Sequence, residues 1–308
     1  MERMSEKIVV GFNGTESSTE AVRWAADEAD LRHAVLRIVC CFDIQPITSD
    51  AALGFGAGAA YDAARSTAES NAKAIRGSIG VSHPGVTLTV DVVPGRAAMA
   101  LLDGLDHDDL VVAGASSHAG ADAFWMGTTP QYLVHHSPCP VAVVRGSASR
   151  GAPDRVLVGV DGSPASAKAL RWAGDEADRH GVELVIVHAW DYPYEPAKIG
   201  SAQGRDLTEI DAACTLDSAV EAARARCAAM VIPMLVEGGP VTALLDTARD
   251  GDVLVVGSRG RRALRSRFFG STANSVLNAA AVPVVVIRAD PDESAAAPLD
   301  SKPALAAV

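Results

Sequence analysis

The chain of 308 residues has few aromatic side chains and no long apolar run. Phe, Trp and Tyr together make up 5% of it, so its cores must be built mainly from Val, Leu, Ile and Ala. No run of about 18 apolar residues occurs, which argues against a membrane-spanning helix. The N-terminal residues MERMSEKIVV also lack the apolar segment of a signal peptide. We therefore expect a cytoplasmic protein that does not associate with membranes.

Cysteines and catalytic signatures are also scarce. The five cysteines are odd in number and include no CxxC pair, which predicts reduced thiols rather than a disulfide framework. The chain has no G-x4-G-K-S/T loop, no HExxH and no supported Ser-His-Asp arrangement. We identify no catalytic residue from the sequence.

Basic residues are outnumbered by acidic ones. The chain has 27 Lys and Arg against 38 Asp and Glu, which gives a formal net charge of −11 at pH 7. A surface of this sign repels both nucleic acid and anionic membranes. We therefore expect neither of them as a partner.

The sequence contains one domain-sized unit twice. IVVGFNG at 8–14 matches VLVGVDG at 156–162, and Asp27-Glu28-Ala29 matches Asp175-Glu176-Ala177. A repeat of this length indicates a duplicated domain rather than a solenoid. We expect a first domain at 1–146, a linker of small and turn-forming residues at 147–154, a second domain at 155–289 and a disordered tail at 290–308.

Each half is expected to alternate strands with helices, which predicts an α/β fold with a parallel sheet. The segment 253–256 (VLVV) is continuously apolar, as is typical of a strand covered on both faces. Pro233 interrupts the third strand of the second half, so this strand is expected at an edge of the sheet. In the first half, the glycine-rich segment Leu53–Tyr61 is expected to form either a surface loop or a lid over a ligand.

The most distinctive segment follows the strand at 253–256. Gly257 and Gly260 lie in a loop, and Gly270 then precedes a helix. Glycine permits positive φ and close approach of a ligand to the backbone, and the free N–H groups of a helix N-terminus attract an anion. The loop holds five arginines, at 259, 261, 262, 265 and 267. The segment therefore suits a polyphosphate, although a solvated basic loop with ordinary turn glycines would have the same composition.

The spacing G-x2-G-x9-G-S after an apolar strand resembles the nucleotide loop of the ATP-binding universal stress proteins. The resemblance extends over nearly the whole chain, with one such unit in each half. It implies two tandem Rossmann-like domains, each an open five-stranded parallel sheet of order 3-2-1-4-5 with helices on both faces. Ligands of such sheets bind beyond the carboxyl ends of the strands, where the strand order reverses. The resemblance also implies that the fifth strands pair across a two-fold axis, here between the two halves, while a homodimer of whole chains stays open.

By this resemblance ATP, with or without Mg2+, is the expected ligand of the second half. Asp161 would lie beside the adenosine and could hold Mg2+; the alternative is an aspartate that only starts a turn. Ala189 would meet the adenine edge through its backbone. From the residues alone, His188 beside it is expected to be a packed or hydrogen-bonded side chain rather than a catalytic base. The nucleotide-binding residues expected in the second half are Asp161, Ala189, Gly257, Arg259, Gly260, Gly270, Ser271 and Thr272.

The first half departs from this pattern. Asn13 replaces the aspartate, which removes a charge and a good Mg2+ ligand, and Ser117 stands where the second loop glycine should be. The corresponding loop, ASSHAGADAFWMGTT, contains no Arg or Lys. We expect at most a weak site there, formed by Asn13, Gly114, Ser117, Gly127 and Thr128.

The function that the resemblance implies is that of a nucleotide-dependent regulator in stress response or growth control. Two alternatives stay open: a nucleotidyl-transferring or ATP-hydrolysing enzyme, and a scaffold that has lost nucleotide binding. We expect slow ATP hydrolysis at most, because no residue is an obvious base for the attacking water.

Overall fold

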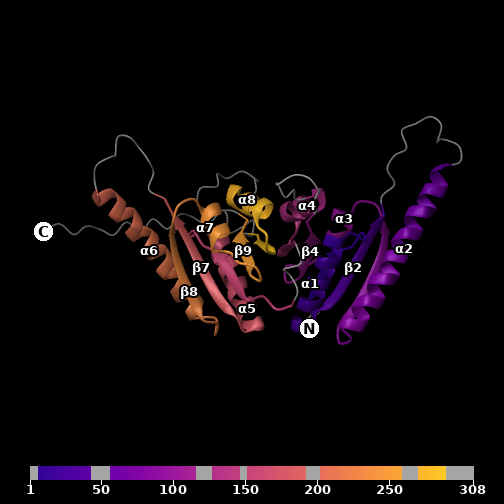
Figure 1. Cartoon of the computed structure of the whole chain (residues 1–308), viewed down its shortest axis with the longest axis horizontal. Coiled ribbons are helices and arrows are strands. Elements are labelled where there is room, and N and C mark those ends of the chain that lie inside the picture. Colours follow the sequence, from indigo (N-terminus) through magenta and orange to yellow (C-terminus); the bar gives the residue numbers. More distant parts are fainter. Residues whose placement is uncertain are drawn as a thin grey trace.

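Both halves of the chain fold as strands that alternate with helices (Figure 1). The computed structural model describes residues 6–42, 56–115, 127–145, 151–191, 202–258 and 270–288. The first half contains β1 (Lys7–Gly11), α1 (Glu16–Arg32), β2 (Val35–Phe42), α2 (Gly56–Ser82), β3 (Thr87–Pro94), α3 (Ala97–Leu102), β4 (Leu110–Gly114), α4 (Thr128–His136) and β5 (Val141–Val144). The second half contains β6 (Arg155–Gly159), α5 (Pro164–His180), β7 (Glu183–Trp190), α6 (Ala202–Arg224), β8 (Val231–Glu237), α7 (Pro240–Thr247), β9 (Val253–Gly257), α8 (Ser271–Ala279) and β10 (Val284–Ile287).

The ten strands of the described residues form one sheet, in the order β3-β2-β1-β4-β5-β10-β9-β6-β7-β8. Neighbouring strands are parallel within each half. The halves meet where β5 and β10 pair antiparallel, with Ala142 opposite Val285. In each half the strand order reverses beside the first strand, between β1 and β4 or between β6 and β9. The strand that contains Pro233, β8, lies at an outer edge, as predicted from this proline.

Helices cover both faces of the sheet over two apolar cores. One core packs α1, α2, α5 and α6 on the sheet, with side chains such as Ile79, and the other packs α3, α4, α7 and α8, with side chains such as Leu277. Strand residues alternate between these cores, so Ile8 and Val10 of β1 enter the first and Val9 enters the second. Figure 1 shows α2 and α6 on the two outer flanks of the molecule. The predicted α/β fold with a mostly parallel sheet is confirmed.

The helices that follow β1 and β6 begin and end in the same way. Thr15 caps α1 and Ser163 caps α5, and each hydroxyl accepts the backbone N–H three residues further on. α5 ends at Gly181 with φ 66°, and α1 ends at His33 with φ 52°, both in the left-handed region. These caps fix the N-termini of both helices at the carboxyl edge of the sheet.

We expected the glycine-rich segment Leu53–Tyr61 to be a loop. Instead, α2 begins within this segment, at Gly56. Residues 53–55 lie outside the described residues. The later turns of this helix bury Ile75 and Ile79 against the sheet. Tertiary packing of this kind outweighs the low helix propensity of glycine in the first turns.

The predicted linker, the predicted tail and the expected lack of a membrane-spanning helix can be compared with the structure only in part. Residues 147–150 of the predicted linker and the predicted tail at 290–308 lie outside the described residues. Within the described part of the chain, no helix combines the length and the apolar character of a membrane span.

Two arginines that follow the central strands reach across from one half to the other. Arg145, directly after β5, is buried and donates to the last carbonyls of α8, including those of Asn278 at 3.0 Å and Ala280 at 3.3 Å. Arg288, directly after β10, donates to the carbonyl of Ser137 at the end of α4, at 2.9 Å. A helix leaves its last carbonyls without partners, and cations there are favourable. Each half therefore holds the C-terminal end of a helix that belongs to the other half.

Candidate functional site

A cavity of about 420 Å3 lies at the carboxyl end of the parallel strands of the first half. It is bounded by the ends of β1, β2 and β4 and by the N-terminal turns of α1 and α4. This is the switch point of the strand order, where open parallel sheets bind their ligands. Four residues predicted for the first-half site line it: Asn13, Gly114, Gly127 and Thr128.

The second half brings the equivalent residues to the same end of its own strands. Asp161 follows β6, Gly257 ends β9, and Gly270 precedes α8. β6 and β9 are neighbours in the sheet, so Asp161 and Gly257 lie on the two sides of the second switch point. Those predicted residues of this half that the structure describes thus lie around one edge of the sheet.

Three predicted site residues, Ser117, Arg259 and Gly260, lie outside the described residues. The other four arginines of the loop, at 261, 262, 265 and 267, lie outside them as well. The roles that the sequence suggests for these residues therefore stay predictions.

Asn13 and Asp161 hold equivalent turns. The Oδ1 atom of Asn13 accepts the N–H of Thr15 at 3.2 Å and its hydroxyl at 2.7 Å, and Oδ1 of Asp161 accepts the N–H of Ser163 at 3.0 Å. Each side chain thereby fixes the turn that leads to the capping residue of the next helix. This geometry supports the turn-starting role that we considered for Asp161. The same carboxylate places a negative charge at this crevice that Asn13 cannot supply.

The glycines that end β4 and β9 are required by packing within the protein. A Cβ atom on Gly114 would lie 2.4 Å from the carbonyl oxygen of Ser17, and one on Gly257 would lie 2.8 Å from the carbonyl carbon of Ala165. Neither glycine has a positive φ, so these two positions do not use the left-handed conformation that glycine permits. The absence of a side chain instead lets the first turn of α1 or α5 approach the strand. Gly257 therefore shapes the crevice through the position of α5.

The helices α4 and α8 begin without a side-chain cap. Gly127 and Gly270 are the N-cap residues, and neither provides a side-chain hydrogen bond. The N–H of Gly270 donates to the carbonyl of Ser258 at 2.9 Å, so this amide is not the free donor that we had expected. The next amides, beginning with Ser271 and Thr272, belong to the first turn, where a helix has no carbonyl of its own to offer.

A difference between these two helix starts was not recognised from the sequence. The third residue of α4 is Pro130, whereas the third residue of α8 is Ala273. Proline has no N–H group, so the first turn of α4 has one donor fewer than that of α8. Pro130 lines the cavity of the first half. The signal was present in the sequence, as GTTP against GSTA.

The end of β7 lies beside β6. His188 is buried, and its Nδ1 lies 2.7 Å from the carbonyl oxygen of Val160, which confirms the packed, hydrogen-bonded histidine predicted from the sequence. Ala189 follows it and is partly buried. The equivalent residue of the first half is Cys41, which lines the cavity. Burial raises the pKa of the Cys41 thiol, so this side chain is present there as a neutral group.

These observations define a class of protein: two doubly wound α/β domains in tandem, each with a switch point of the kind at which such sheets bind their ligands. The sequence profile of the universal stress protein family matches residues 4–145 and again residues 153–288. The chain therefore belongs to the universal stress protein family and carries two of its domains.

Individual relatives agree with this assignment over both halves. A universal stress protein of Mycolicibacterium smegmatis is 30% identical over 288 residues, which cover 91% of this chain and 96% of the relative. A universal stress protein of Mycobacterium tuberculosis is 29% identical over 298 residues, which cover 93% of this chain and 98% of the relative. The crystal structure of a universal stress protein from Archaeoglobus fulgidus has the same fold, with a TM-score of 0.64 at 18% identity over 93% of this chain and 99% of its own.

Proposed function

We propose that this protein is an ATP-binding regulator that holds the nucleotide in its second half. The observation that carries this proposal is the start of α8 at the switch point. Its first turn has no side-chain cap, and Ser271, Thr272 and Ala273 add three successive amides to the positive end of the helix dipole. Such a turn suits the oxygens of a phosphate group.

The surroundings of this turn fit the rest of a nucleoside triphosphate. The hydroxyls of Ser271 and Thr272 can donate to phosphate oxygens, and the five arginines between 259 and 267 supply positive charge in an otherwise acidic chain. Ala189 and Asp161 lie at the ends of the neighbouring strands β7 and β6, where the adenosine would bind. Asp161 has a carboxylate that could join a phosphate-bound Mg2+, since Mg2+ is often held by one or two carboxylates together with phosphates. We therefore infer ATP with Mg2+ as the ligand.

The first half is expected to bind ATP weakly or not at all. It has Asn13 in place of the aspartate, no Arg or Lys between residues 115 and 129, and Pro130 in place of an amide donor. Each lost contact to a phosphate is worth about 1 kcal/mol or somewhat more. Loss of two or three such contacts lowers the affinity by roughly 100-fold.

A matched pair of substitutions tests the proposal. Gly270→Leu and Gly127→Leu change equivalent N-cap residues, and both have backbone angles that any residue adopts, with φ −63° at Gly270 and φ −56° at Gly127. Purified protein is denatured, and the released nucleotide is identified by absorbance and mass. We expect ATP to be released from the wild type and from Gly127→Leu, but not from Gly270→Leu. Circular dichroism checks that each variant is folded.

The same material separates the competing functions. Retention of ATP by folded Gly270→Leu would overturn the phosphate cradle at α8, and calorimetry that gave two equally tight ATP sites would overturn the asymmetry. A protein that binds no ATP at all would be a scaffold. Fast conversion of labelled ATP to a defined product would make it an enzyme.

ATP that binds to the folded state stabilises that state by mass action. The stability of the protein therefore depends on the concentration of ATP. We expect the protein to act in stress response or growth control in the cytoplasm. We also expect that whole chains can form a homodimer, which light scattering with and without ATP measures.

A further inference from the structure

The second feature of interest lies between the two halves, far from the proposed nucleotide site. Glu28 and Arg32 are in the last turns of α1, and Glu176 and His180 occupy the equivalent positions in α5. α1 begins at the crevice and extends for 17 residues, or about 25 Å, so its last turn lies at the opposite edge of the sheet. The two helix ends meet there, where the repeated sequence places two glutamates and only one histidine.

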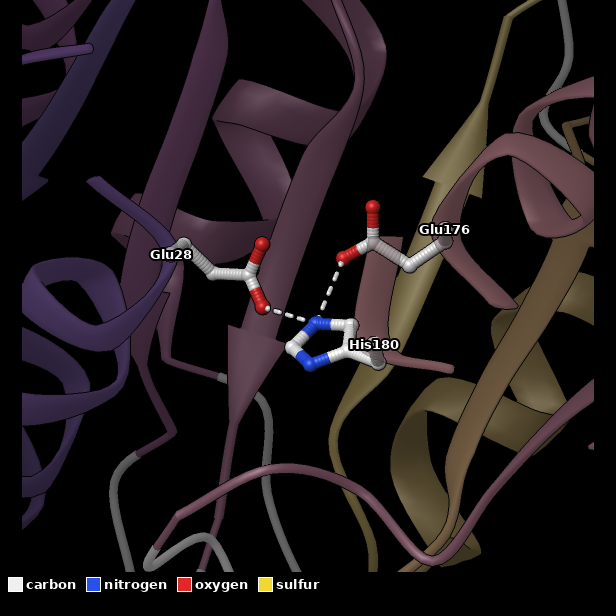
Figure 2. Close-up of side chains that lie close together, drawn as sticks. All are labelled: Glu28, Glu176 and His180. Carbon is white, nitrogen blue, oxygen red and sulfur yellow. Dashed lines mark hydrogen bonds and ion pairs between the residues drawn. The ribbon is translucent and has the colours of Figure 1, made fainter. Parts of the chain in front are cut away.

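Three ligand-type atoms converge in this cluster. His180 Nε2 lies 3.0 Å from Glu28 Oε1 and 3.4 Å from Glu176 Oε1, and the three atoms all lie within 4.8 Å of one another. Figure 2 shows both interactions meeting at the same ring nitrogen, with the glutamates approaching from opposite sides. A tetrahedral zinc site with bonds of about 2.0–2.1 Å separates its ligand atoms by roughly 3.4 Å. The two nitrogen–oxygen distances are therefore close to those of a zinc site.

Arginines hold the other oxygen of each glutamate. Arg32 donates through Nε to Glu28 Oε2 at 3.0 Å and through Nη2 to Glu176 Oε2 at 2.7 Å. Arg179 also donates to Glu176 Oε2, at 3.0 Å. Each carboxylate is thus oriented by its Oε2 atom and directs its Oε1 atom at the imidazole. Outer hydrogen bonds of this kind position the carboxylate ligands of metal sites.

The one hydrogen that His180 Nε2 can carry cannot form a full hydrogen bond to both Oε1 atoms. The Nε2 atom of an imidazole carries at most one hydrogen, so two carboxylates that are 2% and 1% exposed must share it. Three acidic side chains, Glu6, Glu28 and Glu176, face two guanidinium groups, those of Arg32 and Arg179. The excess of acidic groups can be balanced by a proton, on His180 or on a carboxyl group, or by a cation. A divalent ion bonds to both oxygens at once, which a proton on one nitrogen cannot do.

We propose that Glu28, Glu176 and His180 bind one divalent transition-metal ion of the zinc class between the two halves. Neutral imidazole and carboxylate oxygens are ligands that Zn2+ accepts, and three protein ligands leave a fourth position for water. One ligand comes from the first half and two come from the second. The bound ion therefore joins the halves at the edge of the sheet opposite the nucleotide crevices.

The test uses the full chain, treated with a chelator and then titrated with Zn2+ alone. We expect calorimetry to give one ion per chain and thermal unfolding to move to a higher temperature. Substitution of Co2+ should give the visible absorption bands of a tetrahedral or five-coordinate site, which a surface ion without protein ligands lacks. Absence of binding by the wild type would overturn the proposal.

Variants assign the ion to this cluster. His180→Arg introduces the residue that the first half has at this position, so it keeps a cation for the ion pairs while removing the imidazole. We expect it to fold, to lose the Co2+ bands and to show no thermal shift with Zn2+. His180→Gln is the second variant if His180→Arg does not fold. His136→Gln is the control, because His136 is exposed and lies next to another histidine, where a metal could bind without this cluster. Loss of the bands in His136→Gln, or their retention in a folded His180 variant, would overturn the assignment.

Discussion

Replacement of Gly257 by alanine distinguishes a packing role from a ligand-binding role. The added Cβ would lie 2.8 Å from the carbonyl carbon of Ala165 and 3.0 Å from the amide nitrogen of Ser166. These atoms are backbone of the first turn of α5, so they can move only if the helix moves. The perturbation is thus an overpacked contact between β9 and α5, with no change of charge.

The magnitude follows from two opposing effects. Overpacking of a well-packed core lowers the free energy of unfolding by about 1–3 kcal/mol, and a contact with backbone belongs at the upper end of this range. Alanine in a strand regains about 0.5–1 kcal/mol relative to glycine. We therefore expect Gly257→Ala to lose about 2 kcal/mol. Gly159→Ala is the control, because its Cβ would meet the flexible side chain of Leu244 at 3.1 Å, and we expect it to change stability little.

The assay is unfolding in urea, followed by circular dichroism for the wild type and both variants without nucleotide. A loss of about 2 kcal/mol also lowers the melting temperature by roughly 4 °C or more. Equal stability of Gly257→Ala and the wild type would refute the packing argument. If such a stable variant had also lost ATP, the glycine would be required by the ligand instead.

Two further predictions concern buried groups. Arg145→Met removes three hydrogen bonds to the last carbonyls of α8, each worth about 1.5–3 kcal/mol when the donor is charged. Methionine also avoids the cost of burying the guanidinium, which offsets part of this loss, so the free energy of unfolding in urea should fall by about 2–3 kcal/mol; an unchanged urea midpoint would contradict this. Burial raises the pKa of Cys40 and of Cys139 to about 11, so both should react slowly with a thiol reagent at pH 8 while the exposed Cys214 reacts fast. All five thiols should react in denaturant, and fast reaction of Cys139 in the folded protein would show that the burial argument is wrong.

The α/β fold was predictable because the repeated pattern carries its own signals. Short apolar strands and caps at the start of helices are local features that both halves repeat, and glycine at the end of α5 is a further local signal. The start of α2 was missed because the glycines at 54, 56 and 58 lower the local helix propensity. What stabilises this helix is the contact of Ile75 and Ile79 with the sheet, which depends on the folded structure.

The site was predictable in its position but less so in its details. Residues at the ends of neighbouring parallel strands must come together, so Asn13 and Gly114 could be assigned to one crevice before the structure was known. That Gly257 makes room for a helix could not be read from the sequence, because the contacting residue lies far away along the chain. The meeting of Glu28 with His180 depends in the same way on how the halves pair.

The antiparallel junction of β5 and β10 has a consequence for how this protein can change. In an assembly of identical chains, every substitution occurs in both copies of a site, so one copy cannot be altered while the other is preserved. Here a covalent link keeps unlike partners together at high effective concentration, whatever the abundance of the protein. A codon change therefore alters one side alone, as Asn13 opposite Asp161 and Arg32 opposite His180 illustrate. The two halves can therefore take different functions within a single gene.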